Sequence, residues 1–242
     1  MDDVGGAPGA AVENDDLAKI IDHALLHPGL SEEQIAAGCA LAREHGVASV
    51  TVRPSDVELA AGWMESSGVA LGSVVSFPHG NATTSVKLYE ARDLIRRGAR
   101  ELDVAINLGK MISRQFAYVE MELVQMVKAC HESGAVAKIL LPLAHLAGDL
   151  RIIAIKIAKR AESDYLAVMG ACPPEDLQFL HSRCGDRLKL KAAAETLEQA
   201  LAARQAGCTR LGTTATAAIL EAWKAQKEMD HPRPLPQTPS TT

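Results

Sequence analysis

Residues 101–141 read ELDVAIN-LGKMIS-RQFAYVEMELVQMVKACHES-GA-VAKILL. The first and last segments are short runs of β-branched and aliphatic residues, which is typical of buried strands. Between them, residues 114–133 place apolar side chains at helical spacing and are followed by a glycine. This order of strand, helix and strand predicts a βαβ unit with parallel strands.

The same alternation runs along most of the chain. Strands are expected near residues 19–25, 48–53, 72–77, 101–107, 136–141, 164–169, 187–192 and 209–213. Helices are expected over residues 31–45, 56–66, 84–98, 114–133, 146–162, 174–184, 196–206 and 216–227. Eight units of roughly 25 residues favour one closed (β/α)8 TIM barrel over a doubly wound sheet, which has fewer strands. The chain is therefore predicted to be an α/β protein with a single domain.

Composition and the chain ends set further limits. Of the 242 residues, 48% are hydrophobic but only 3% are aromatic, so the core must be built from aliphatic side chains. We expect the barrel to span residues 16–227. It would lie between a flexible leader at residues 1–15 and a disordered, Pro- and Thr-rich tail at residues 228–242.

Charge and cysteine usage argue against several classes of function. A net charge of −5 offers no basic footprint for nucleic acid and no general attraction to an anionic membrane. No stretch is long and apolar enough to span a bilayer, and the start of the chain lacks a secretory signal. The five cysteines contain no CxxC pair, and the histidines lack metal-ligand spacing. We therefore expect a cytoplasmic protein with reduced thiols and no metal site.

Strand alternation places charged side chains inside the predicted barrel. In the fourth strand the apolar side chains would face the helices, so Glu101, Asp103 and Asn107 would face the interior. The same alternation points Lys138 and Lys191 inward. A structural ion pair would explain such buried charges, but an aspartate beside two lysines is also suited to proton transfer. Crowding of the ammonium groups should lower the pKa of at least one lysine, which could then act as an acid, a base or an imine-forming nucleophile.

Several short motifs resemble the deoxyribose-phosphate aldolase family. In chain order they are IDHALL at 21–26, VTVRP at 50–54, FPHGN at 77–81, ELDVAIN at 101–107, KILL at 138–141 and RLGTT at 210–214. The resemblance covers roughly residues 16–225, which is most of the chain. It implies a (β/α)8 barrel of the class I aldolase type. Such enzymes make or break a carbon–carbon bond through a lysine imine, or Schiff base, with no metal or other cofactor.

The resemblance also implies roles for individual residues. Asp103 matches the family's proton-relay aspartate, and Lys191 matches the second lysine, which tunes the imine-forming one. Lys138 matches a lysine at the end of the fifth strand, and Asp22 matches an acidic position on the first strand. Strand alternation selects Asp103 and both lysines independently of the resemblance.

One departure from the family pattern concerns the imine-forming lysine. The family carries it on the sixth strand, where this sequence has Ala167, and a methyl group cannot form an imine. The polar loop that follows is replaced by Ala-Cys-Pro-Pro at 171–174. We therefore expect the pocket near Ala167, Val168 and Met169 to be more apolar than in the family.

A second departure concerns phosphate. The family's Gly-Gly turn after the seventh strand, which holds a phosphate on backbone N–H groups, is replaced by residues 192–195. Glu195 would repel a phosphate. Thr213 and Thr214 keep part of a second phosphate-binding segment. A non-phosphorylated substrate is therefore expected.

Three functions fit these observations. The first is an enzyme that acts on a small-molecule carbonyl compound, by aldol or retro-aldol cleavage or by a related condensation, cyclisation or dehydration. Lys191 would be its nucleophile or acid, Asp103 its proton shuttle, and Lys138 would tune Lys191 or stabilise an enolate. The second is a conventional 2-deoxyribose 5-phosphate aldolase with a relocated lysine, and the third is a non-catalytic metabolite-binding barrel. The predicted substrate contacts are Asp22, Arg53 (as an anion contact), Asn107, Thr213 and Thr214.

Three further residues have simpler interpretations. His23 should point towards the helix layer in a structural role, and His79 could bind substrate or cap its loop. Cys172 lies at the active face, where a structural thiol is favoured over a reactive one. Barrels of this kind often pair, so a homodimer is the default expectation.

Overall fold

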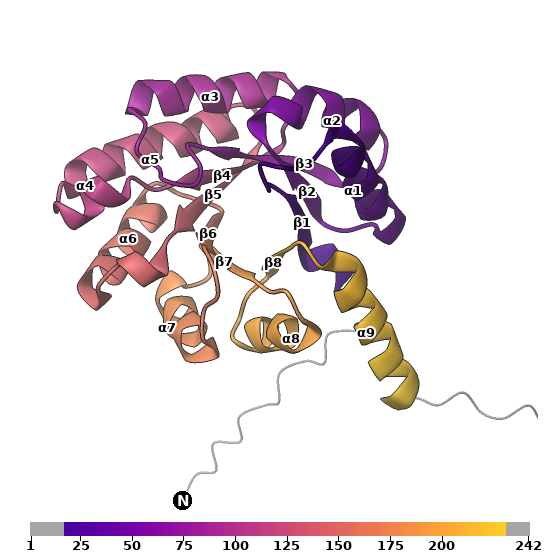
Figure 1. Ribbon diagram of the computed structural model, residues 1–242. Helices are drawn as coiled ribbons and strands as arrows, with labels where there is room; N and C mark the ends of the chain where they lie inside the picture. Colours follow the sequence, from indigo (N-terminus) through magenta and orange to yellow (C-terminus); the bar gives the residue numbers. More distant parts are fainter. Residues whose placement is uncertain (1–16, 231–242) are drawn as a thin grey trace, which may run out of the picture.

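The structure, a computed structural model, describes residues 17–230. Eight parallel strands close into a barrel in the order β1 to β8, and helices surround it (Figure 1). The predicted (β/α)8 TIM barrel is confirmed. The predicted leader at residues 1–15 and the segment 231–242 lie outside the described residues.

The elements follow the predicted order closely. The strands are β1 (Ile21–Leu25), β2 (Ser49–Val52), β3 (Ala70–Val75), β4 (Glu101–Ala105), β5 (Val136–Leu141), β6 (Tyr165–Val168), β7 (Lys189–Ala193) and β8 (Arg210–Thr213). The α-helices are α1 (Glu32–His45), α2 (Val57–Met64), α3 (Thr84–Arg96), α4 (Leu108–Ile112), α5 (Phe116–His131), α6 (Gly148–Arg160), α7 (Pro174–Cys184), α8 (Leu197–Gln205) and α9 (Thr216–Asp230). Short 3-10 turns add η1 (Ala18–Ile20), η2 (Pro54–Asp56) and η3 (Leu143–His145).

Most boundaries lie within a few residues of the prediction, and two of the differences have clear local descriptions. The predicted helix over 114–133 is preceded by the short helix α4, which begins because the Asn107 side chain accepts a hydrogen bond from the Lys110 N–H at 3.1 Å. Arg114 then takes a positive φ of 56° and separates α4 from α5. At the other end of the chain α9 continues to Asp230, so residues 228–230 are helical and do not begin a disordered tail.

The inner and outer faces of the barrel wall are chemically distinct. Outward-facing strand residues pack with the helices in one aliphatic core, which includes Leu102, Val104 and Ile139. The inward-facing positions instead carry most of the buried charges, together with a small apolar cluster of Ala105, Leu140 and Ala167. Ala105 and Leu140 lie towards the carboxyl ends of their strands, where the active face of such barrels is expected, whereas Glu101 and Arg210 are the first residues of theirs.

The loop between β3 and α3 packs tightly on the end of β4. Gly80 adopts a φ of +64°, and a Cβ there would lie 2.0 Å from the carbonyl oxygen of Ile106. Only glycine allows this close approach of two backbones. The contact therefore fixes the loop against the strand that carries Asp103.

Among residues 17–230, no helix is both long and apolar enough to cross a membrane.

Candidate active site

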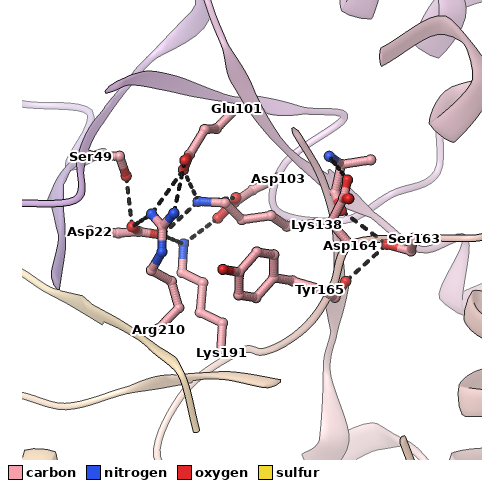
Figure 2. A network of polar contacts seen from close by, with 11 residues as sticks. Asp22, Ser49, Glu101, Asp103, Lys138, Ser163, Asp164, Tyr165, Lys191 and Arg210 are labelled. Carbon is pink, nitrogen blue, oxygen red and sulfur yellow. Dashed lines mark hydrogen bonds and ion pairs between the residues drawn. The ribbon is translucent and has the colours of Figure 1, made fainter. Parts of the chain in front are cut away.

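Six charged side chains meet inside the barrel, as Figure 2 shows. Three are carboxylates and three are cations, so the cluster has no net formal charge. They come from five strands: Asp22 (β1), Glu101 and Asp103 (β4), Lys138 (β5), Lys191 (β7) and Arg210 (β8). Charges so deeply buried are tolerated only when each has partners, and here every member has at least two.

Lys138 lies at the centre of this charge cluster. Its Nζ is 2.6 Å from Asp22 Oδ2, 2.5 Å from Glu101 Oε2 and 3.6 Å from Asp103 Oδ1. The side chain is 0% exposed. Burial alone would lower its pKa, but Asp103, Asp22 and Glu101 outweigh burial and raise the pKa well above the usual range. Lys138 is therefore not a lysine with the lowered pKa that was expected for at least one of the two, because three carboxylates converge on it.

Asp22 links the two lysines. Its Oδ2 lies 2.6 Å from Lys138 Nζ and 2.8 Å from Lys191 Nζ, and its Oδ1 accepts a hydrogen bond from the Ser49 hydroxyl at 2.7 Å. Burial would raise the pKa of Asp22, but Lys191, Lys138 and Arg210 together hold it well below the usual range. Asp22 is therefore a permanent anion that keeps the two ammonium groups close together.

Arg210 and Glu101 complete the cluster. Arg210 Nη1 is 2.5 Å from Asp22 Oδ1, and its Nη2 is 3.0 Å from Glu101 Oε1. Its guanidinium carbon lies 5.5 Å from the centre of the Tyr165 ring, a cation–π contact. The interpretation of the sequence left Arg210 out of the site, although Arg210 alternates with the outward-facing Leu211 and could have been found by the test that selected Lys191.

Lys191 and Asp103 form the pair nearest the active face. Each is the third residue of its strand, and Lys191 Nζ lies 2.7 Å from Asp103 Oδ2. Their side chains are 9% and 7% exposed, whereas Lys138 is fully buried. Gly212 on β8 makes room for the lysine, because a Cβ there would lie 3.2 Å from Lys191 Cε. The geometry thus brings three predicted catalytic residues together, and of these three Lys191 and Asp103 are the more accessible.

Ala167 stands directly beside this pair. The register of β6 and β7 pairs Ala167 with Lys191. Ala167, Ala105 and Leu140 form the small apolar cluster, and Met169 packs against it. Ala167 and Met169 contribute to this apolar cluster, whereas Val168 faces outward and packs in the main core. A pocket more apolar than the family's stays a prediction.

The Glu195 side chain, from the loop after β7, lies at the end of β8. Its Oε2 accepts hydrogen bonds from the hydroxyls of Thr214 at 2.8 Å and Thr213 at 3.3 Å. The Thr214 backbone N–H also donates to it at 3.3 Å. α9 begins two residues later, at Thr216, and a helix N-terminus favours a negative charge. The protein's own carboxylate therefore takes up the donors of Thr213 and Thr214.

Two side chains that were predicted to contact the substrate, Arg53 and Asn107, instead bond to neighbouring parts of the chain. Arg53 Nε lies 2.6 Å from Asp56 Oδ2, and its Nη1 donates to the carbonyl oxygens of Pro28 at 2.9 Å and His27 at 3.3 Å. Arg53 thereby ties the loop after β1 to the loop after β2. Asn107 caps α4. Neither side chain joins the charge cluster.

The remaining candidates are peripheral. His23 Nδ1 lies 2.9 Å from the Thr216 hydroxyl, which confirms that the ring points towards the helix layer, and burial lowers its pKa. His79 is exposed on the loop after β3. Burial raises the pKa of the Cys172 thiol to about 11, so it stays protonated near neutral pH. In the described part of the chain, no three His, Cys, Asp or Glu side chains are grouped so that they could hold a metal ion.

Known proteins with similar sequences are deoxyribose-phosphate aldolases. The chain is 34% identical to the one from Caldanaerobacter subterraneus, over 87% of this chain and 94% of that protein. It is 35% identical to the one from Thermococcus gammatolerans, over 85% of this chain and 96% of that protein. The chain belongs to the deoxyribose-phosphate aldolase family. It is thus an aldolase-type lyase, whose superfamily works generally through a Schiff base.

Solved structures agree with this assignment. The tetrameric deoxyribose phosphate aldolase from Aeropyrum pernix superposes with a TM-score of 0.81 at 28% identity, covering 88% of this chain and 93% of that one. No protein-family model matches the chain.

Proposed function

We propose that this member of the deoxyribose-phosphate aldolase family cleaves or forms a carbon–carbon bond beside a carbonyl group by using Lys191 as its imine-forming amine. Asp103 is the proton shuttle and Lys138 is a fixed cation. The substrate carries no phosphate. The observation that carries the proposal is the contact between Lys191 Nζ and Asp103 Oδ2, at 2.7 Å, beside an alanine at the family's lysine position.

The position of Lys191 supports this change of amine. Neighbouring strands lie about 4.8 Å apart, so the residue paired with Ala167 approaches the same space from the adjacent strand. The methyl group of Ala167, which is fully buried, takes up little of that space. An amine on β7 therefore reaches a carbonyl carbon that sits against Ala167, Ala105 and Leu140.

Asp103 has the geometry to move the necessary protons. It accepts a proton from the Lys191 ammonium, and the neutral amine then adds to the carbonyl carbon. Return of that proton to the hydroxyl of the adduct releases water and leaves an iminium ion on Lys191. The bond between the substrate's α and β carbons breaks as the β-hydroxyl loses its proton to Asp103, and its electrons form an enamine. Protonation of the enamine and hydrolysis release both carbonyl products and regenerate Lys191.

Lys138 takes no part in bond making on this pathway. Its complete burial and its raised pKa keep it charged, and it contacts all three carboxylates. Its Nζ lies 3.6 Å from Asp103 Oδ1, so it places a fixed positive charge beside the proton shuttle. Lys138 is therefore a positioning residue.

Glu195 is the reason for a substrate without phosphate. Its carboxylate already accepts hydrogen bonds from Thr213 and Thr214. A phosphate at this end of the barrel would meet a like charge and would find the same donors engaged. Conventional cleavage of 2-deoxyribose 5-phosphate is the alternative substrate choice, with the same lysine.

A second mechanism, enolisation of a bound ketone, draws on the same contacts of Lys191. Lys191 Nζ touches two carboxylates, Asp103 and Asp22, which suits an ammonium that stays charged. Such a group would stabilise the enolate of a bound ketone while Asp103 removed the proton, with no covalent step. A barrel that only binds a metabolite would show neither covalent capture nor turnover. We also retain a homodimer as a proposal for the assembly.

Covalent capture separates these possibilities. The protein is mixed with stoichiometric acetaldehyde or 2-deoxyribose and reduced with borohydride, and the modified residue is located by peptide mapping. Lys191 should carry the adduct. The Lys191→Ala variant should lose it, and the Lys138→Ala variant, where it folds, should keep it. Lys189→Ala is the matched control, because Lys189 lies two residues earlier on β7 and is exposed.

An adduct on Lys138, or one spread evenly over surface lysines, would contradict imine formation on Lys191. Turnover measurements complete the test. Proton exchange of a ketone without any adduct would favour the enolate mechanism. For the phosphate question, Glu195→Gln should improve kcat/KM for 2-deoxyribose 5-phosphate relative to 2-deoxyribose. Glu65→Gln, at an exposed position after α2, is the control. An unchanged ratio would refute the role of Glu195.

A further inference from the structure

A groove of about 640 Å³ lies between α7 and α8 at the active face. One wall is formed by Pro173, Pro174 and Leu177, from the loop after β6 and from α7. The other wall is α8, where Ala202 and Ala203 face the space. The groove is large enough to take a substituent of several carbon atoms.

Small side chains create this space. Ala202 and Ala203 on α8 face Leu177 across the gap and leave it unfilled. Pro173 and Pro174 begin α7 and hold its first turn in a fixed conformation. A groove lined by rigid prolines and alanines costs little conformational entropy to occupy.

The groove reaches the strand that carries Lys191. Ala193, the last residue of β7, lines it, and Ala193 lies two residues beyond Lys191 on the same side of the strand. Two residues of extended strand span about 7 Å between Cα atoms. Lys191 Nζ itself lies a side chain's length into the barrel, against Asp103 and Asp22. A chain attached to a carbonyl carbon at Lys191 must therefore pass over the end of β7 to enter the groove.

The rim of the groove selects against negative charge. Glu198 lines it, and the Gln199 side chain is already bonded to the Glu195 N–H at 2.8 Å. No lysine or arginine is among the described residues that line it. The lining is therefore suited to a neutral hydrocarbon chain.

We propose that this groove binds a neutral, apolar substituent of the aldehyde substrate, so that the enzyme prefers aldehydes with an alkyl chain of several carbons. This assignment rests on the proposed function, because it places the carbonyl group at Lys191. The groove defines the substrate class, because it receives the alkyl chain that lies away from the reacting bond.

Binding can be measured without catalysis. Cys172 lines the groove and is partly exposed, whereas the other cysteines are buried. Alkylation of Cys172 by N-ethylmaleimide, followed by intact mass at pH 9, reports whether the groove is occupied. The ligands are 1-alkanols from ethanol to hexanol, which cannot form an imine. The concentration that gives half-maximal protection should fall about fourfold per methylene group.

A filled groove provides the matched variant. Ala202→Leu places a larger side chain in the space, and Ala40→Leu makes the same change at an exposed position of α1. Ala202→Leu should abolish the dependence of protection on chain length, and Ala40→Leu should leave it unchanged. Lack of protection in the wild type, or equal protection in Ala202→Leu, would overturn the proposal.

Aldol addition then tests the role in catalysis. KM for aldehydes from propanal to hexanal should fall by at least tenfold across the series, and 6-oxohexanoate should bind more weakly than hexanal. Ala202→Leu should raise KM for hexanal and leave that for propanal unchanged. Turnover with a KM independent of chain length would refute the groove as the substrate site. Protection of Cys172 without turnover of any aldehyde would instead refute the aldolase chemistry.

Discussion

Removal of Lys138 should be among the most damaging single changes to this protein. Lys138→Met leaves three buried carboxylates with two cations, because Lys138 contacts Asp22, Glu101 and Asp103. Loss of one partner from a buried ion pair costs about 3–5 kcal/mol, since the remaining charge stays desolvated. Domains of this size are stable by about 5–15 kcal/mol, so the loss is a large fraction of the total.

The loss should depend on pH in a defined direction. Without Lys138, burial raises the folded-state pKa of at least one carboxylate above its unfolded value of about 4. Such a group contributes stability below about pH 4 and loses it as the pH rises through the raised pKa. In the wild type the pKa of Asp22 is lowered, so its contribution persists until the pH falls below about 4. The difference between variant and wild type should therefore be largest at pH 7 and should shrink by pH 5.

Urea unfolding at pH 7 and pH 5 measures this difference. Adding Glu101→Gln to Lys138→Met restores equal numbers of charges and should recover part of the stability at pH 7. Lys87→Met is the matched control, because Lys87 is equally buried and pairs with Glu122 at 2.6 Å outside the cluster. Glu101→Gln should not rescue it. A loss below about 1 kcal/mol, or an equal loss at both pH values, would refute this account of the cluster.

Two other changes test local features. Gly80→Ala should lower the free energy of unfolding, measured in urea, by about 2 kcal/mol or more, because Gly80 has a positive φ and the new Cβ would meet the Ile106 carbonyl. Gly62→Ala within α2 is the control and should be neutral or stabilising. Equal effects of the two substitutions would contradict the backbone contact. Alkylation of Cys172 by iodoacetamide, followed by mass spectrometry, should accelerate about tenfold per pH unit and level off only near pH 11; levelling near pH 8.5 would contradict the raised pKa.

The barrel was predictable because its pattern repeats. Eight strands alternate with helices of similar length, and an error at one boundary does not change the count. Boundaries set by single side chains were not predictable in the same way. The short helix α4 exists because Asn107 caps it and Arg114 ends it with a left-handed residue, and neither event alters the hydrophobic period.

The candidate site was predictable only in part. Alternation gives the side of a strand on which a residue lies, and this located Asp103, Lys138 and Lys191. It does not give the number of charges that meet across the barrel, so neither the convergence of Asp22 and Glu101 on Lys138 nor the raised pKa of Lys138 was foreseen. The contacts of Arg53 depend on the path of two loops, which has no periodic signal.

The balance of charges in the cluster supports the proposed division of roles. On the proposed pathway each proton that Asp103 takes up comes from Lys191, 2.7 Å away, or from the substrate bound to it, and Asp103 later returns it to the same adduct. The total charge on Lys191 and Asp103 is the same in every state of the pathway. These states are ammonium with carboxylate, amine with carboxylic acid, iminium with carboxylate, and enamine with carboxylic acid. The remaining four charges, on Asp22, Glu101, Lys138 and Arg210, therefore never need to change or move. In a buried site, where an uncompensated charge is costly, a reaction that shifts protons only between Asp103 and the adduct on Lys191 avoids that cost at every step.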